Sequence, residues 1–391
     1  MARWLLPEGI SDVLPSEARF LEQLRRAALD LYRGYGYELV VPPLLEYTDS
    51  LLTGVGADLD LRTLKLVDQL SGRLLGLRAD ITPQVARIDA HILNRAGVVR
   101  LCYAASVLHA RPLHPLATRE PFYVGAELFG HESVAADAEV LELAVRSLAL
   151  AQVQGLRFDL GHTRILRALL ELDPSAQQLA EDIVAALSAK DAAALAPLTA
   201  DLAVPARTAL RALLRLHGDE RVLVAARAEL PPRPAVVAAL DELQQLVAVL
   251  KRLGAAVSID LADLHGFHYH TGATFAAYAA GWPLALARGG RYDDIGRAFG
   301  RARPATGFSI DLRELARLHQ GTAVPAILAP AGDEGALVAL VEKLRAAGEV
   351  VIRRLGDDDR IDGLECDREI RLFNGVWQVF ERPSAGTADK P

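Results

Sequence analysis

The sequence predicts an α+β protein in which an antiparallel sheet is flanked by helices. Two observations favour this fold over a doubly wound parallel sheet: most strand-like stretches are joined by hairpins, and the helix-like stretches are unevenly spaced. A long Ala- and Leu-rich block interrupts the strands and reads as an all-helical insert. With 391 residues, the chain is long enough for more than one domain.

The N-terminal part begins with a predicted helix that has clear start and stop signals. Pro15 opens the pattern and Gly34 lies at its end, with apolar residues spaced three or four apart between them. The stretch "YELVV" then predicts a strand that ends at Pro42 and Pro43. A hairpin follows, and a second helix is expected to open near Thr82, which precedes a proline.

The stretch "SVLHARPLHPLATREPFYVGAELFG", residues 106–130, reads as strand, loop and strand. It carries Arg111, Glu120 and Glu127, more charge than is typical of a core hairpin. Arg111 and Glu120 could belong to solvated surface. Glu127, however, lies in an otherwise apolar strand, where a carboxylate needs a partner, and an imidazole or ammonium ligand would supply one.

The remainder of the chain suggests an insert and a second domain. The insert covers about 164–252, and strands then lead to a predicted helix over 306–318. The last part reads strand, helix, strand and a final strand pair. We expect domains at 1–322 and 323–391, with a disordered tail in the second one over 382–391.

Composition limits the function classes. The formal net charge of −7 argues against nucleic-acid binding. Cys102 and Cys366, the two cysteines, can form neither a disulfide framework nor a structural zinc site alone, so a reducing cytoplasm is the natural setting. We see no secretory signal and no apolar stretch long enough for a membrane span.

The motif "HGFHYH" places His265, His268 and His270 within six residues. In a strand, His268 and His270 would share a face and could hold a metal ion. No third ligand pair is evident, so the favoured interpretation is the polar wall of a pocket, and we predict no metal site.

Two further motifs carry residues that are typical of ligand sites. "LRADITPQ" puts Asp80 and Thr82 before a helix start, where Thr82 could act as an N-cap or Asp80 could receive an ammonium group. Both readings stay open on the sequence. "ARGGRYDDIG" contains two glycines followed by Arg291 and Tyr292, which fits either a ligand loop or a bulged hairpin.

Taken together, these segments resemble the histidyl-tRNA synthetases, class II aminoacyl-tRNA synthetases, over residues 4–318. "YELVVPPLLE" is similar to the first, dimer-forming motif of that class, and residues 106–130 to its second, ATP-binding motif. "HGFHYHTGATF" stands at the histidine signature, "GGRYD" matches the family pattern, and "ATGFSIDLREL" is similar to the third motif. The resemblance implies a class II synthetase-like sheet and a homodimer.

The departures from the synthetase pattern imply that no adenylate forms. Leu108 stands where the family has the arginine that grips the ATP α-phosphate, and Ala110 replaces a glutamate. Glu314 occupies the place of the γ-phosphate arginine, and His265 that of the signature arginine. Losing one charge-assisted contact typically removes about 1.5–3 kcal/mol of binding. The C-terminal part also looks short for an anticodon-binding domain, so a working histidyl-tRNA synthetase remains only the alternative.

This profile resembles the regulatory subunits of ATP phosphoribosyltransferase. The resemblance implies a non-catalytic subunit that needs no cofactor and supports the first step of histidine biosynthesis. Its implied partners are a short-form catalytic subunit, within a larger hetero-oligomer, and histidine as feedback effector. The subunit stoichiometry and the place where histidine binds stay open.

The resemblance also implies a histidine site, residue by residue. Asp80 and Thr82 match the residues that receive the α-amino group, and Glu127 matches the carboxylate that reads the imidazole. Tyr292 matches an aromatic wall, while His270 and Tyr123 replace a tyrosine and a glutamine. The expected histidine site therefore consists of Asp80, Thr82, Arg111, Tyr123, Glu127, His270 and Tyr292, with no catalytic residue among them.

Overall fold

The computed structural model describes residues 4–53, 57–112, 117–264, 266–318, 325–356 and 365–382. The chain divides into two compact units, Met1–His319 and Gln320–Pro391. None of the described helices is long and apolar enough to cross a membrane.

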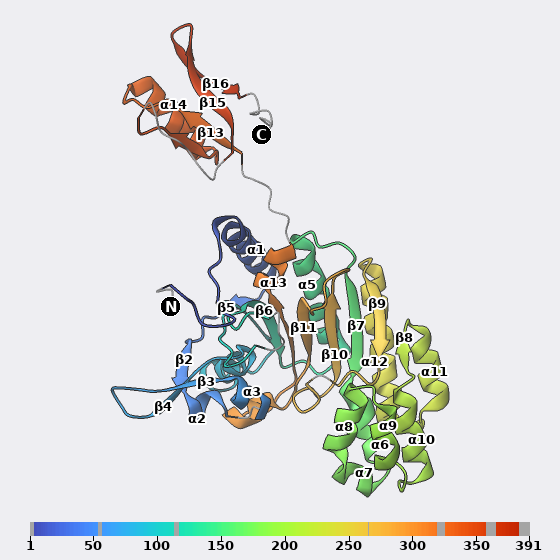
Figure 1. Ribbon diagram of the computed structural model, residues 1–391. Coiled ribbons are helices and arrows are strands. Elements are labelled where there is room, and N and C mark those ends of the chain that lie inside the picture. The colour runs from blue at the N-terminus through green and yellow to red at the C-terminus, as the bar shows by residue number, and fades with distance from the viewer. Residues whose placement is uncertain are drawn as a thin grey trace. The chain divides into compact units, whose positions relative to one another are not determined.

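A nine-stranded sheet forms the centre of the first unit (Figure 1). Its neighbours from β5 to β7 are all antiparallel, as predicted, whereas β1 with β5 and β7 with β9 pair in parallel. In spatial order the strands are β1 (Glu38–Leu39), β5 (Val99–Ser106), β6 (Phe122–Phe129), β12 (Ala305–Asp311), β11 (Ala287–Arg291), β10 (Ala273–Tyr278), β7 (Arg157–His162), β9 (Ala256–Asp260) and β8 (His217–Gly218).

Three long helices bury their apolar faces in the main core of this unit: α1 (Pro15–Gly34), α5 (Val134–Leu150) and α12 (Pro234–Arg252). The predicted first helix is confirmed, with a proline at its first turn. Its buried side chains Leu24, Ala28 and Tyr32 recur every four residues, which places them on one stripe. The opposite face of the sheet carries a second core, in which residues 81–86 and 292–295 pack against β5 and β6.

The insert packs beside the β7–β9–β8 edge of the sheet (Figure 1). It is helical as predicted except for the two residues of β8, which pair with β9. Besides α12 it contains α6 (Thr163–Leu170), α7 (Pro174–Gln178), α8 (Ala180–Ser188), α9 (Ala192–Leu198), α10 (Val204–Leu213) and α11 (Arg221–Glu229).

Shorter elements surround the other end of the sheet. A three-stranded sheet has the order β2-β4-β3 and contains the predicted hairpin. These elements are β2 (Leu45–Tyr47), β3 (Leu64–Val67), β4 (Leu74–Leu77), α2 (Thr48–Leu51), α3 (Ala57–Arg62), α4 (Thr82–Arg87), the π-helix η1 (Ile88–Leu93) and the 3-10 helix η2 (Ile295–Phe299).

The predicted helix over 306–318 is wrong in its first half. Residues Ala305–Asp311 form β12, and only Leu312–Leu318 form a helix, α13. The stretch alternates Gly307, Phe308, Ser309 and Ile310, and β6 and β11 pair with it on both sides. These ladder hydrogen bonds decide in favour of a strand where the local pattern was ambiguous.

The second unit has a four-stranded sheet in the order β14-β13-β15-β16, with β13 parallel to both of its neighbours. The predicted succession of strand, helix, strand and strand pair is observed as β13 (Ala326–Ala329), α14 (Gly335–Ala346), β14 (Val351–Arg353), β15 (Cys366–Phe373) and β16 (Val376–Glu381). Apart from Arg382, the predicted tail over 382–391 lies outside the described residues.

Candidate functional site

Glu127 lies at the centre of the candidate site. It points from β6 into the protein and is 1% exposed. On the neighbouring strand β12, the residue directly opposite is Gly307. A Cβ atom there would lie 1.5 Å from Glu127 Oε2, so only glycine leaves room for this carboxyl group.

Three hydroxyl groups surround the Glu127 carboxyl group. Thr82 Oγ1 donates to Oε1 at 2.8 Å and Tyr103 OH donates to the same oxygen at 3.2 Å. Tyr292 OH donates to Oε2. Burial raises the pKa of Glu127 to about 8, although the hydrogen bonds from Tyr292 and Thr82 act in the opposite direction. At neutral pH the carboxyl group is therefore largely protonated, and in that form its own O–H donates to one of these hydroxyl groups, which then accepts.

Asp80 and Thr82 flank this carboxyl group at the start of α4. Asp80 Oδ1 accepts from the backbone N–H groups of Ile81 and Thr82, at 2.6 and 3.2 Å. The Thr82 hydroxyl does not cap the helix, because it donates to Glu127. Of the two readings left open by the sequence, N-capping by Thr82 is therefore wrong, and the half-buried Asp80 carboxylate is positioned as an anionic neighbour of Glu127.

Two aromatic rings form one wall. Tyr292 is buried and stacks on Tyr269, with ring centroids 5.1 Å apart and planes inclined by 28°. The Tyr269 hydroxyl is buried, and no group of the described residues forms a hydrogen bond with it. Tyr103 and Tyr269 were not among the predicted site residues. The alternation of β5 places Tyr103 opposite Gly125 of β6, but that register is visible only in the folded sheet.

Tyr123 lies on the same face of β6 as Glu127, four residues before it, and is half-buried. Its partner across the ladder is Asp311 on β12. Burial, with a smaller contribution from Glu314, raises the pKa of Asp311 to about 7. Burial and the nearby Asp311 in turn raise the pKa of Tyr123. The neighbourhood of Tyr123 therefore contains a second buried carboxyl group, and the glutamine expected from the synthetases is replaced by a phenol.

His270 and Arg111 differ in their relation to this centre. The His270 ring is half-buried and meets Tyr269 edge to face, with centroids 5.2 Å apart. It therefore lies behind the aromatic wall. Arg111 is exposed, and no described residue forms a hydrogen bond or ion pair with it. The structure thus brings Thr82 and Tyr292 into contact with the Glu127 carboxyl group and places Asp80 near it, while Tyr123 lies farther along β6, His270 lies against Tyr269 and Arg111 is apart.

The histidine motif forms a turn rather than the strand considered for metal binding. His268 is exposed and lies 3.1 Å from Glu181 Oε2 of the insert. His265 lies outside the described residues, and the described part of the chain contains no group of three metal-ligating side chains. Because β10 begins only at Ala273, the alternation that would have aligned His268 with His270 does not exist.

The positions of the synthetase ATP arginines offer no cation to a triphosphate. Leu108 is half-buried, and its N–H donates to Arg78 O at 3.0 Å. On α13, Glu314 is buried and ion-paired with Arg317 at 2.9 Å. Its neighbour Arg313 donates to the backbone oxygens of Glu120 and Ser11, at 3.0 and 2.8 Å. Arg313 and Arg317 are therefore engaged in contacts within the protein and are not placed to bind phosphate.

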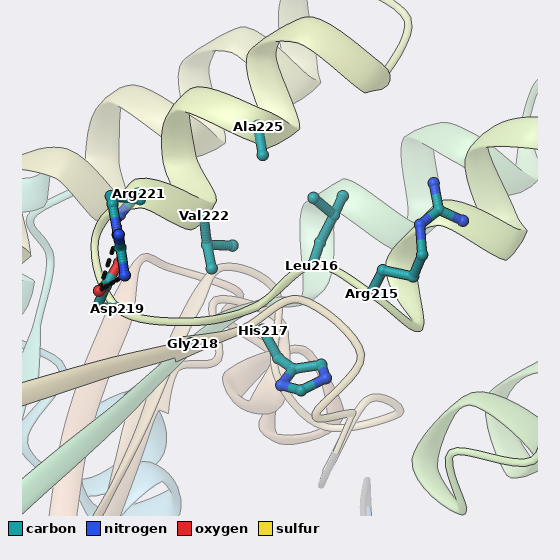
Figure 2. Close-up of a pocket in the computed structure, with 8 residues that line it drawn as sticks. All are labelled: Arg215, Leu216, His217, Gly218, Asp219, Arg221, Val222 and Ala225. Atoms are coloured by element: carbon teal, nitrogen blue, oxygen red, sulfur yellow. Dashed lines mark hydrogen bonds and ion pairs between the residues drawn. The ribbon is translucent and has the colours of Figure 1, made fainter.

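A separate hollow lies in the insert, between β8 and the start of α11, and is lined by residues 215–219, 221, 222 and 225 (Figure 2). Two arginines of this hollow are already paired: Arg221 lies 2.7 Å from Asp219 and Arg215 lies 2.6 Å from Glu229. Since its cations are neutralised, the hollow provides no charge for an anionic ligand.

Two family models match the chain. Residues 9–315 match the histidyl-tRNA synthetase family, and residues 324–380 match the C-terminal domain of the ATP phosphoribosyltransferase subunit HisZ. A curated relative from Burkholderia lata, named ATP phosphoribosyltransferase regulatory subunit, is 57% identical over 98% of this chain and 100% of its own length. The chain belongs to the ATP phosphoribosyltransferase regulatory subunit family. A relative of the same name from Cupriavidus taiwanensis is 56% identical, over 97% of this chain and 99% of that one.

Solved structures agree with the fold of this family. A Bacillus halodurans protein described as an ATP phosphoribosyltransferase regulatory subunit/histidyl-tRNA synthetase is 28% identical, with a TM-score of 0.80 over 91% of this chain and 94% of that one. Histidyl-tRNA synthetase from Nostoc is 17% identical, with a TM-score of 0.78 over 95% of this chain and 92% of that one, and shows the fold alone. The predicted class II synthetase-like fold and the predicted regulatory, non-catalytic family are confirmed.

Proposed function

We propose that this chain assembles with a short-form catalytic subunit of ATP phosphoribosyltransferase in the cytoplasm and senses histidine through the pocket around Glu127. The observation that carries the proposal is the buried Glu127 carboxyl group, held by Thr82 and Tyr292 in a fold whose ATP clamp is lost. The regulatory-subunit name of the relatives supports a catalytic partner.

The chemistry of the pocket fits an imidazole ligand. A buried carboxyl group with a pKa of about 8 is stabilised when a basic ring nitrogen takes its proton or shares it in a hydrogen bond. Tyr269 and Tyr292 present a flat aromatic wall for the ring. Asp80, with one oxygen used by the backbone and the other available, suits the α-ammonium group.

A homodimer is part of the proposal. Strand β1 is an edge strand that pairs only with β5 in the described part of the sheet. Around it the apolar side chains of Leu39, Val41, Leu44 and Leu45 are exposed, Val41 to 80%. An exposed strand edge with an apolar surface is typical of a protein–protein interface. The predicted dimer-forming segment around the proline pair lies within this surface.

The test is reconstitution of the purified chain with a short-form catalytic subunit from the same genome. We expect a stable complex whose phosphoribosyltransferase activity exceeds that of the catalytic subunit alone and falls when histidine is added. Calorimetric titration of the isolated chain with histidine then locates the effector. Assembly without activation would contradict the regulatory role, and activation without histidine binding to this chain would contradict the sensing pocket.

A further inference from the structure

Arg62, the last residue of α3, has a cationic side chain with unused hydrogen-bonding capacity beside the candidate pocket. Its Nη2 lies 3.5 Å from Ala79 O and 3.2 Å from His109 Nε2. Its Nε is buried and has no hydrogen-bond partner among the described residues. No Asp or Glu of the described residues forms an ion pair with this guanidinium group. A guanidinium has five N–H donors, so most of the donors of Arg62 are unused.

His109 contacts this arginine and brings no opposite charge to it. The His109 ring is fully buried on the hairpin. Burial, together with the neighbouring Arg62 charge, lowers the pKa of His109 to about 4, so the ring is neutral at pH 7. His109 Nε2 also lies 3.1 Å from Ala79 O, so it accepts from Arg62 in the tautomer protonated at Nδ1 and donates to Ala79 O in the other, whereas a charged ring would repel the guanidinium group. The half-buried guanidinium group is therefore fixed in position but not neutralised.

The charges of the pocket leave one requirement unmet. Asp80, Glu127 and Asp311 are acidic groups, and a zwitterionic amino acid also brings a carboxylate. A desolvated carboxylate needs a cation or several N–H donors. In an amino acid, the ammonium and carboxylate groups are both bonded to the α-carbon. The protein side chains that bind these two groups must therefore be neighbours. Arg62 is the candidate for this neighbour, since its Nη2 lies 3.5 Å from the backbone oxygen of Ala79, directly before Asp80, and its charge acts to lower the pKa of Tyr123.

We infer that Arg62 binds the α-carboxylate of the amino-acid ligand whose ammonium group lies at Asp80. The inference rests on the proposed histidine pocket and assigns it a residue that the sequence motifs do not mark. Arg288 of β11 is a second cation near Tyr123, but it is exposed and no described residue holds it. Arg288 therefore serves as the matched control for loss of one positive charge.

The experiment compares two ligands that differ only in the carboxylate. The full chain is titrated calorimetrically with L-histidine and with L-histidinamide, in which a neutral amide replaces the carboxylate. A pH of about 6.5 keeps both α-amino groups protonated. The wild type should prefer histidine about tenfold to a hundredfold, the range expected for a charge-assisted contact. Arg62→Gln should abolish this preference while binding histidinamide as the wild type does, and Arg62→Lys should keep part of it.

The remaining outcomes separate this inference from the function it builds on. Arg288→Gln should retain the full preference for histidine. If Arg62→Gln still prefers histidine, or if it also loses histidinamide, Arg62 does not act on the carboxylate and the inference is overturned while the pocket stands. A wild type that binds neither ligand overturns the pocket and the inference together.

Discussion

Replacement of Glu127 by glutamine should change how the stability of the protein depends on pH. The folded-state pKa of Glu127 is about 8, against an ordinary value near 4.5. Between these values the folded protein holds a proton that the unfolded chain has released, so the wild type loses stability as the pH rises toward 8. The loss is about 1.4 kcal/mol per pH unit. A glutamine side chain at this position would have the shape of the protonated group but cannot titrate.

We therefore expect Glu127→Gln to gain about 2.7 kcal/mol of unfolding free energy relative to the wild type between pH 5.5 and 7.5. Urea denaturation of the full chain at the two pH values measures this difference, and the C-terminal unit is common to both proteins. Glu132→Gln, an exposed change just beyond the same strand, is the matched control and should show no such gain. If the unfolding free energies of Glu127→Gln and the wild type depend on pH in the same way, the conclusion that Glu127 is buried and protonated is refuted.

The purified chain should show only background histidine-dependent exchange of pyrophosphate into ATP, and turnover like that of a synthetase would contradict the lost clamp. Val41→Glu should shift the sedimentation of the micromolar protein from dimer to monomer, and a monomeric wild type would count against the dimer edge. In the reconstituted complex, Glu127→Gln should weaken histidine inhibition severalfold while activation is retained, and an unchanged inhibition curve would place the effector elsewhere. Asp137→Asn should lower the unfolding free energy by about 1.5–3 kcal/mol in calorimetry, because the buried Arg291 then keeps only Asp293 as an ion-pair partner among the described residues; a change within error would show that the Arg291–Asp137 pair is not structural.

Prolines and glycines at the ends of helices allowed those helices to be predicted from the sequence. Pro15 and the glycines after residue 33 mark α1, and Thr82 with its following proline marks α4. The same signals failed for Ala305–Asp311, where a short apolar run fits a helix and a strand equally well. Pairing with β6 and β11 decided that case, and such long-range pairing leaves no local trace in the sequence.

The candidate site shows a similar division. Asp80, Thr82, Glu127 and Tyr292 could be predicted because they belong to motifs with a recognisable order along the chain. Tyr103 and Tyr269 could not, since their roles depend on cross-strand register and ring stacking. Arg62 and His109 were missed for a related reason: each is ordinary in its local sequence, and their functional character comes from a contact made across 47 positions of the chain.

The geometry around Glu127 explains why loss of catalysis need not abolish ligand recognition. The resemblance to the synthetases implies that their phosphate contacts correspond to Leu108 on the hairpin and Glu314 on α13. Glu127 instead receives its bonds from α4, β5 and the turn after β11, so changes in the phosphate clamp leave these donors in place. At neutral pH the carboxyl group is held away from its preferred ionised state, and a basic ligand that accepts its proton would relieve that cost. The same buried group would then favour imidazole over neutral rings of equal shape. Regulation of the catalytic partner requires in addition that histidine binds one arrangement of the complex more tightly than another.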